Sequence, residues 1–330
     1  MTLATNCDWR PTASLDTLKR RAQIIARIRE FFARRGVLEV ETPILSAAGT
    51  TDPNLHSFAA QSLAPGANRG LRYLQTSPEF AMKRLLAAGS GSIYQICKVF
   101  RGDESGRYHN PEFTMLEWYR VGFSYRELMD EVVLLATDVL AGFQSPQTAE
   151  KVTYRDAFLA HTSLDPHAAT AADFMAHAQS RQLDVSGLGS GDRDAWRDLL
   201  LTHIVEPHLG RGRFTCLYDY PASQAALARV RAGDPPLAER FEVYFEGIEL
   251  ANGFQELADA NEQRERFERD RRERAKWGLS DVPYDEHLLA ALAHGLPVCS
   301  GVALGLDRLL MLASAATSIA EVVAFPWERS

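Results

Sequence analysis

The sequence has few cysteines, and they form no recognisable site. Cys7, Cys97, Cys216 and Cys299 are scattered and include no Cys-x-x-Cys pair. This spacing argues against a structural zinc site or a disulfide framework and fits a reducing compartment. We interpret all four as buried or incidental thiols.

Long apolar segments are also missing. No apolar run approaches the roughly 18 residues that a membrane-spanning helix needs, and the N-terminus shows no basic region followed by an apolar core. Hydrophobic residues make up 46% of the chain and charged residues 24%, a composition typical of a globular protein with a sizeable core. We therefore expect a cytoplasmic protein that does not associate with membranes.

Positive charge and phosphate-binding loops are scarce as well. The 36 Lys and Arg residues against 43 Asp and Glu give a formal net charge of −7, so non-specific binding of nucleic acid is not expected. Neither Gly-x-Gly-x-x-Gly nor Gly-x-x-x-x-Gly-Lys-Ser/Thr occurs. A nucleotide bound here would have to be held mainly by side chains.

Hydrophobic periodicity predicts helices and strands in mixed order. Apolar residues recur at helical spacing over residues 14–35, and a period of two follows over 37–45, where Pro43 ends a strand or marks an edge. A helix from about Pro78 precedes two strands that flank the charged segment 101–111. Strands joined as hairpins between helices predict an α+β fold with an antiparallel sheet, rather than a βαβ series.

The rest of the chain fits one domain over residues 1–330. A linker-like stretch, "AGFQSPQTAE", opens a mainly helical and weakly patterned insertion at about 142–212. Further strands follow, and residues 261–276 read as a solvated helix in which acidic and basic residues four apart form pairs. A last strand, "PVCSGVAL", precedes a last helix, "GLDRLLMLAS".

Three acids, Glu242, Glu249 and Glu256, lie seven residues apart. An odd spacing puts neighbouring side chains on opposite faces of one strand, so we expect a turn at Glu246–Gly247 and a bulge at Asn252–Gly253 to bring them together. Two of the acids could then bind Mg²⁺ beside a triphosphate, and the third could bind an ammonium group. Acids on strands are also commonly solvent-facing.

Two arginines stand at the ends of predicted elements. Arg101 ends a strand and Arg308 begins a helix inside "GVALGLDR", and guanidinium groups can grip phosphates with two hydrogen bonds. Phe113 could stack on a purine, and Gly301 and Gly305 would let the backbone approach a nucleotide. Each has an alternative role: an arginine at a strand end could form a salt bridge at the rim, Phe113 could fill the core, and the two glycines could serve helix–strand packing.

Taken together, these segments resemble the class II aminoacyl-tRNA synthetases. The segment "GVLEVETPIL" and the helix before it resemble motif 1, "FRGDESGRYHNPEFTMLEWY" resembles motif 2, and "GVALGLDR" resembles motif 3. "TSPEFAMKRLL", "HNPEFTM" and "IELANGFQEL" are closest to the lysine-specific branch. The resemblance covers nearly the whole chain and implies the class II catalytic fold, an ATP-dependent, AMP-forming reaction and a C2 homodimer.

The resemblance also implies roles for individual residues. In it, Arg101 and Arg308 are the catalytic pair that holds the α-phosphate and the terminal phosphate of ATP, and Phe113 stacks on adenine. The implied ATP site contains Arg101, Asp103, His109, Asn110, Phe113, Glu249, Leu250, Gly305 and Arg308. The implied Mg²⁺ ligands are Glu242 and Glu249. The implied amino-acid site contains Ser77, Glu79, Tyr119, Glu256 and Ala303, with Glu79 taking the amino group near the carboxylate and Glu256 with Tyr119 taking the distal ammonium.

The sequence departs from the family pattern at two positions. Motif 2 usually reads Arg-x-Glu, whereas Asp103 and Glu104 follow Arg101 and Gly102 here, so either acid could fill the acidic position. Lysyl-tRNA synthetases tend to have glycine in motif 3 where this chain has Ala303, and an added methyl group in a tight pocket would shift the preferred amino acid.

A larger departure lies at the N-terminus. Lysyl-tRNA synthetases carry an anticodon-binding OB-fold of on the order of a hundred residues, whereas the first catalytic helix is expected here by about residue 14. Together with the acidic net charge, this argues against stable tRNA binding. A lysyl-type chain of this kind is similar to the elongation factor P–(R)-β-lysine ligases. That similarity implies activation of (R)-β-lysine, or of lysine, and transfer to a lysine of elongation factor P, a post-translational modification in translation. The alternatives are a minimal enzyme that charges tRNA, a small amino-acid ligase, and a synthetase-like regulator without activity.

Overall fold

The computed structural model describes residues 9–62, 70–143 and 148–330; Cys7 and residues 144–147 of the predicted linker lie outside them. The α-helices in these ranges are α1 (Leu15–Ala33), α2 (Glu79–Ala87), α3 (Tyr125–Leu140), α4 (Tyr154–Thr162), α5 (Ala171–Ser180), α6 (Arg193–Leu200), α7 (Ala260–Lys276), α8 (Glu286–His294) and α9 (Leu306–Ser314). None of these helices is both long enough and apolar enough to cross a membrane.

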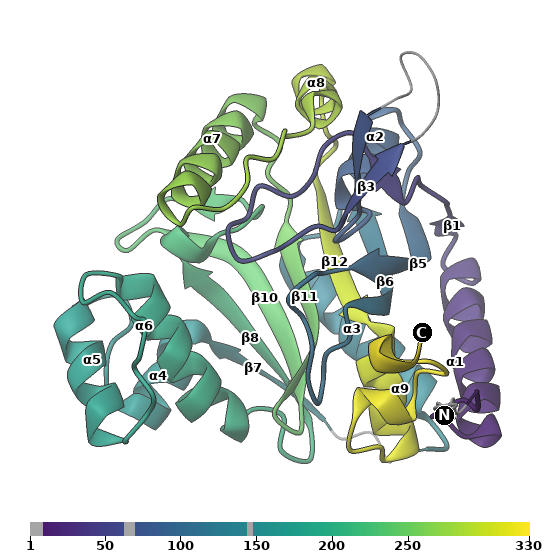
Figure 1. The fold of residues 1–330 in the computed structure, drawn as a ribbon, viewed down its shortest axis with the longest axis horizontal. Helices are drawn as coiled ribbons and strands as arrows, with labels where there is room; N and C mark the ends of the chain where they lie inside the picture. The colour runs from purple at the N-terminus through teal and green to yellow at the C-terminus, as the bar shows by residue number, and fades with distance from the viewer. Residues whose placement is uncertain (1–8, 63–69, 144–147) are drawn as a thin grey trace, which may run out of the picture.

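A large mixed sheet organises the molecule (Figure 1). Its strands run in the order β1 (Leu38–Glu39), β5 (Ile93–Phe100), β6 (Glu112–Val121), β12 (Cys299–Gly305), β11 (Ile248–Gln255), β10 (Leu237–Phe245), β8 (Phe214–Pro221) and β7 (Ala149–Thr153), with β9 (Val230–Arg231) beside β10. The pairs β1–β5 and β7–β8 are parallel, and the central pairs are antiparallel. A smaller sheet has the order β2 (Leu45–Ser46), β4 (Gly70–Leu74), β3 (Ala59–Ser62).

Helices α1, α3 and α9 cover one face of the large sheet and bury the main core. Strand β10 shows the division, because Phe241 and Val243 belong to this core whereas Arg240 and Glu242 alternate with them and point to the opposite face. Burial of each large apolar side chain stabilises the fold by about 1.5–3 kcal/mol. The opposite face is left for polar side chains.

Most of the predicted elements are present, and the predicted strand over residues 37–45 is mainly wrong. Helix α1 begins after Ser14, whose hydroxyl accepts a hydrogen bond from the backbone N–H of Thr17 at 3.1 Å. Strand β1, however, has only two residues and lies at the sheet edge. Pro43 has no N–H for a ladder, and the chain pairs again only at β2, in the smaller sheet.

Beyond residues 144–147, the segment of the predicted insertion contributes one strand and several helices. Strand β7 extends the main sheet at β8, and α4, α5 and α6 follow it with a π-helix at Leu201–Val205. These helices gather at one corner of the molecule in Figure 1. They share an apolar cluster of their own that includes Tyr154, Phe158, Phe174 and Trp196. The assignment of this segment as an insertion stays a prediction.

Candidate active site

A cavity of about 1130 Å³ lies on the polar face of the large sheet. Its walls come from β6, β10, β11, β12, α2, α9 and the hairpin loop 101–111, together with residues of α6 to α8. Of the fifteen site residues expected from the sequence, fourteen line it: Ser77, Glu79, Arg101, His109, Asn110, Phe113, Tyr119, Glu242, Glu249, Leu250, Glu256, Ala303, Gly305 and Arg308. Asp103 does not line it.

Strand register explains why residues far apart in the sequence meet on this face. Ala303 pairs with Glu117 on β6 and with Asn252 on β11, and paired residues of neighbouring strands project from the same face. The next row, two residues along each strand, pairs Gly301 with Tyr119. These rows form the floor of the cavity.

The three acids at sevenfold spacing also reach this face, through one turn and one bulge. The turn at Glu246–Gly247 is present, with φ of 51° and 74°. The predicted bulge at Asn252–Gly253 is wrong, because Val243 pairs with Ala251 while Tyr244 pairs with Glu249, which leaves Leu250 as the extra residue. This single extra residue reverses the alternation, so Glu249 and Glu256 share a face.

Gly253 answers a different requirement. A Cβ atom at this position would lie 2.5 Å from the ring of Phe241 and 2.9 Å from the carbonyl oxygen of Gly301. The packing of β10 and β12 against β11 therefore leaves no room for a side chain at this position. The glycine that the sequence offered as a bulge signal instead reports tight packing.

Arg308 connects motif 3 with motif 2 at one end of the cavity. Its Nη1 donates to the backbone oxygen of Glu249 at 2.7 Å, and its Nη2 lies 2.7 Å from Nε2 of His109. Burial and the positive charge of Arg308 lower the pKa of His109. The imidazole is therefore neutral near pH 7, and its Nε2 can accept a hydrogen bond from an N–H of the guanidinium group.

Arg101 stands beside Phe113 and an acidic residue. Its Nη1 donates to Oε1 of Glu104 at 2.9 Å, and its guanidinium carbon lies 5.2 Å from the centre of the Phe113 ring. Glu104 lines the cavity, whereas Asp103 is 68% exposed and contacts His56. Of the two acids that the sequence left open for the motif 2 position, the cavity therefore contains Glu104, and the expectation that Asp103 lies at this site does not fit its outward position.

Glu242 and Glu249 lie near this end of the cavity. Glu242 accepts hydrogen bonds from Nη2 of Arg240 and from the hydroxyl of Tyr244, both at 2.5 Å. Burial and the charge of Glu242 raise the pKa of Glu249. No group of three or more acidic, His or Cys side chains in the described ranges is placed to hold a metal ion. These two carboxylates fit Mg²⁺ only if phosphate oxygens and water complete its shell.

The opposite end of the cavity holds an ion-pair chain that the sequence reasoning missed. Nζ of Lys83 lies 2.6 Å from Oε1 of Glu79 and 2.6 Å from Oε2 of Glu256, and the lysine side chain is 1% exposed. Although burial lowers it, the charges of Glu256 and Glu79 raise the pKa of Lys83, so the ammonium group stays charged. The spacing of Glu79 and Lys83, one helical turn apart, was the available signal.

Glu117 is a further buried carboxyl group at the site, and the sequence reasoning missed it. Ser77 Oγ donates to one of its oxygens and the Tyr119 hydroxyl to the other, each at 2.7 Å. Burial and the charge of Glu79 raise the pKa of Glu117 to about 8. The Tyr119 hydroxyl is thus bound to Glu117 in this structure, whereas the sequence reasoning placed it with Glu256. Glu117 precedes Tyr119 by two residues on β6, and this spacing could have indicated that their side chains share a face.

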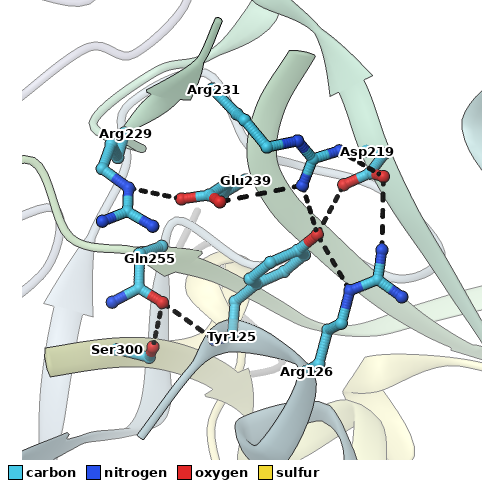
Figure 2. Close-up of polar contacts among 8 residues, drawn as sticks. All are labelled: Tyr125, Arg126, Asp219, Arg229, Arg231, Glu239, Gln255 and Ser300. Atoms are coloured by element: carbon cyan, nitrogen blue, oxygen red, sulfur yellow. Dashed lines mark hydrogen bonds and ion pairs between the residues drawn. The ribbon is translucent and has the colours of Figure 1, made fainter. Parts of the chain in front are cut away.

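A polar network behind the sheet holds the strand end that carries Glu256 (Figure 2). The side-chain oxygen of Gln255 accepts from the backbone N–H of Tyr125 at 3.1 Å and from Oγ of Ser300 at 3.2 Å. The Tyr125 hydroxyl in turn donates to the buried Asp219 at 2.6 Å, and Arg231 donates to the same carboxylate at 2.9 Å. Helix α3 and strands β8, β9 and β11 are thereby fixed around the base of the site.

Comparison with known proteins agrees with this geometry. The family described as tRNA synthetases class II (D, K and N) matches residues 5–329. The chain belongs to this family, which accounts for its antiparallel central sheet, its flanking helices and the two arginines facing one cavity.

Within the family, the chain is similar along its whole length to proteins named elongation factor P–(R)-β-lysine ligase. It is 52% identical to that of Pectobacterium carotovorum over 323 residues, or 98% of each chain. It is 52% identical to that of Salmonella typhi over 325 residues, again 98% of each. It is 51% identical to that of Vibrio vulnificus over 321 residues, 97% of this chain and 98% of the relative.

Proposed function

We propose that this protein uses ATP to activate (R)-β-lysine as an adenylate and transfers the lysyl group to a lysine side chain of elongation factor P. The observation that carries the proposal is the division of the cavity. Arg101 and Arg308 line one part of it, among Glu104, His109 and Glu249, and the partly buried Glu79 and the buried Glu117 and Glu256 line another. Two acids paired with one internal lysine, and a third buried acid on the same wall, fit a substrate that brings two ammonium groups. The names of the relatives support the same substrate and acceptor.

In the first step, a carboxylate oxygen of the substrate attacks the α-phosphorus of ATP and pyrophosphate leaves. Arg101 and Arg308 neutralise the phosphates, Phe113 stacks on adenine, and His109 and Glu104 hold the two arginines in place. Mg²⁺ held by Glu242 and Glu249 would supply further neutralisation of phosphate charge. These side chains act by position and charge.

In the second step, the neutral amine of the acceptor lysine attacks the carbonyl carbon of the adenylate. AMP leaves with the electrons of the carbon–oxygen bond, and the amine nitrogen releases a proton as the amide forms. The enzyme needs no covalent intermediate, because the adenylate is already activated and held in the cavity. Such a reaction on a translation factor would take place in the cytoplasm.

The experiment that tests the proposal is intact-mass analysis of elongation factor P after incubation with this protein, ATP and Mg²⁺. We expect a gain of one lysyl unit with (R)-β-lysine, slower gain with L-α-lysine, and none after Arg308→Ala, which removes a phosphate contact. Charging of lysine tRNA is measured in parallel. Charged tRNA with unmodified elongation factor P would instead support a compact synthetase, and activity on free amino acids alone would support a small ligase. No adenylate with any substrate would support the inactive regulator.

We also propose a C2 homodimer, although the apolar stripe of α1 does not support it. Ile24, Ile28, Phe31 and Phe32 are buried within the monomer core. The proposal rests instead on the family resemblance and on two exposed apolar residues, Leu38 on the edge strand β1 at 55% exposure and Val298 just before β12 at 70%. Exposed apolar side chains of this kind are buried when an interface covers them.

A further inference from the structure

Lys83 is the internal partner of two carboxylates on different elements. It projects from α2, as Glu79 does, and reaches Glu256, which follows the last residue of β11. Because one nitrogen atom contacts both groups at 2.6 Å, the two contacting oxygens lie no farther apart than twice that distance. A single ammonium group therefore ties together the carboxylates assigned above to the two amino groups of the substrate.

We infer that Lys83 sets the spacing of the diamine subsite, so that the site favours a substrate whose two nitrogens are separated by four carbons over one in which five carbons separate them. The inference rests on the proposed function, because it takes Glu79 and Glu256 as the ligands of the two ammonium groups. It assigns a specificity role to a residue that need not touch the substrate.

The two lysine isomers differ in the number of carbons between their amino groups. In β-lysine the amino groups are on the third and sixth carbons, so four carbons lie between the nitrogens. In α-lysine they are on the second and sixth carbons, so the path has five carbons and the nitrogens can lie about one bond length farther apart. Two carboxylates drawn together by a shared counter-ion match the shorter pair.

The surroundings make this spacing rigid. Lys83 and Glu256 are both buried, and Oε1 of Glu256 packs directly over Gly301, in space that a Cβ atom at that position would occupy. The network around Gln255 fixes the backbone on the other side (Figure 2). A carboxylate held in this way cannot adjust to a longer diamine without breaking its contact with Lys83.

The first test uses the unmodified enzyme and two diamines that lack a carboxylate. We expect 1,4-diaminobutane to compete with (R)-β-lysine in ATP–pyrophosphate exchange about tenfold more strongly than 1,5-diaminopentane. Equal inhibition by the two diamines, or stronger inhibition by the longer one, would overturn the inference. This measurement needs no variant to fold.

The second test removes or replaces the bridge. Lys83→Met should raise KM for (R)-β-lysine and bring the preference between the diamines to within about twofold, while KM for ATP stays unchanged. Lys83→Arg keeps the charge but separates the two carboxylates across a wider group, so it should shift the preference toward 1,5-diaminopentane. Lys276→Met removes a largely exposed lysine paired with Glu273 and should leave every ratio unchanged.

Failure of this inference can be told apart from failure of the proposed function. If neither lysine isomer supports exchange with the unmodified enzyme, the proposed function fails. If exchange occurs and Lys83→Met keeps the full preference for the four-carbon diamine and a normal KM for ATP, then Lys83 is not the spacer. A raised KM for ATP together with weaker inhibition by both diamines to the same extent would show a structural role and would also refute the inference.

Discussion

In the part of the cavity assigned to the amino acid, acidic side chains outnumber basic ones. Glu79 and Glu256 share one lysine, Lys83, and Glu117 is hydrogen-bonded to Ser77 and Tyr119. Burial raises the pKa of Glu256 to about 7 and that of Glu117 to about 8. Without substrate, these carboxyl groups therefore hold protons near neutral pH that a dication would displace. Substrate binding and proton release are coupled in such a site.

Glu117→Gln should change how stability depends on pH. The pKa of Glu117 is 4.5 in its ordinary state and about 8 in the folded protein, so between these values the folded state holds a proton that the unfolded chain has released. Its contribution to the free energy of unfolding therefore falls as pH rises through this window. We expect the variant to be more stable than the unmodified protein at pH 9, by on the order of a few kcal/mol, and the difference to shrink toward pH 5.

Denaturant unfolding at several pH values measures this effect. Glu30→Gln, which alters an exposed ion pair with Arg34, is the matched control and should leave the pH dependence unchanged. A Glu117→Gln curve parallel to that of the unmodified protein would show that Glu117 is ionised in the folded protein. The other groups facing Glu117, which are Glu79, Glu256 and Tyr119, remain in both proteins.

Ala303→Gly should weaken the preference for the β isomer. Ala303 pairs with Glu117 and lines the cavity floor, so loss of its methyl group deepens the pocket where the amino acid binds. A methyl group in such a pocket changes discrimination by about tenfold. We expect kcat/KM for L-α-lysine to rise relative to (R)-β-lysine in ATP–pyrophosphate exchange, and an unchanged ratio would contradict a role of this methyl group.

Sequence reasoning found some of these residues and missed others for a physical reason. Glu79, Glu256 and Arg308 lie within short motifs whose residue types match their proposed chemistry. Lys83 and Glu117 gain their positions only when α2 and β6 pack beside β12, and a buried lysine on a helix has the same local pattern as an exposed one. Their burial is a tertiary property.

At the scale of elements, the turn of the β10–β11 hairpin was predicted at the right residues. The bulge in β11 was predicted at the wrong ones. Residues Glu246 and Gly247 have the positive φ angles that a two-residue hairpin turn needs, and the sequence signals this locally. The bulge at Leu250 has no glycine to mark it, since it follows from the register that β10 and β12 impose on β11.

Gly253→Ala tests the close approach of these strands. The new methyl group would meet the Phe241 ring and the Gly301 carbonyl, and overpacking of this kind costs about 1–3 kcal/mol. We expect a lower denaturant midpoint at unchanged m-value. Gly189→Ala, where a Cβ atom would meet nothing within 4 Å, is the control, and equal stability of the two variants would refute the packing argument.

Helix α7 shows another limit of local patterns. The predicted pair between Glu262 and Arg266 is present, but the helix is not simply solvated. Arg266 is buried and donates to the carbonyl oxygens of Ala226 and Ala228 at 2.7 and 2.9 Å. Ala228 bridges to Glu256, so this charged helix supports the wall of the site, which its alternating charges alone do not reveal.

At the scale of the whole molecule, the class of fold was predictable because hairpin-forming strands and capped helices leave local signals. The order of strands was not, since β12 inserts between β6 and β11 although residues 122–247 separate those two strands in the chain. The three motifs come together only in this order. The resemblance to the synthetase family, and not hydrophobic periodicity, indicated that the three motifs meet at one site.

Leu38→Asp tests the proposed dimer. Leu38 is exposed on the edge strand β1, so a charge there costs little in the monomer but is costly in an apolar interface. We expect sedimentation velocity to show a dimer for the unmodified protein and a monomer for the variant. Exposed Leu134→Asp, on α3, is the control and should remain dimeric; a monomeric unmodified protein would contradict the proposal.

The extra residue at Leu250 makes chain length, rather than residue identity, the most sensitive property of this hairpin. Removing any one residue between Glu249 and Glu256 would restore simple alternation and turn one of these carboxylates toward the apolar core. Homologous enzymes can therefore diverge in side chains along β11 but not by single insertions or deletions. Alignment gaps within this strand would mark proteins in which the carboxylates corresponding to Glu249 and Glu256 no longer lie on the same face of the sheet.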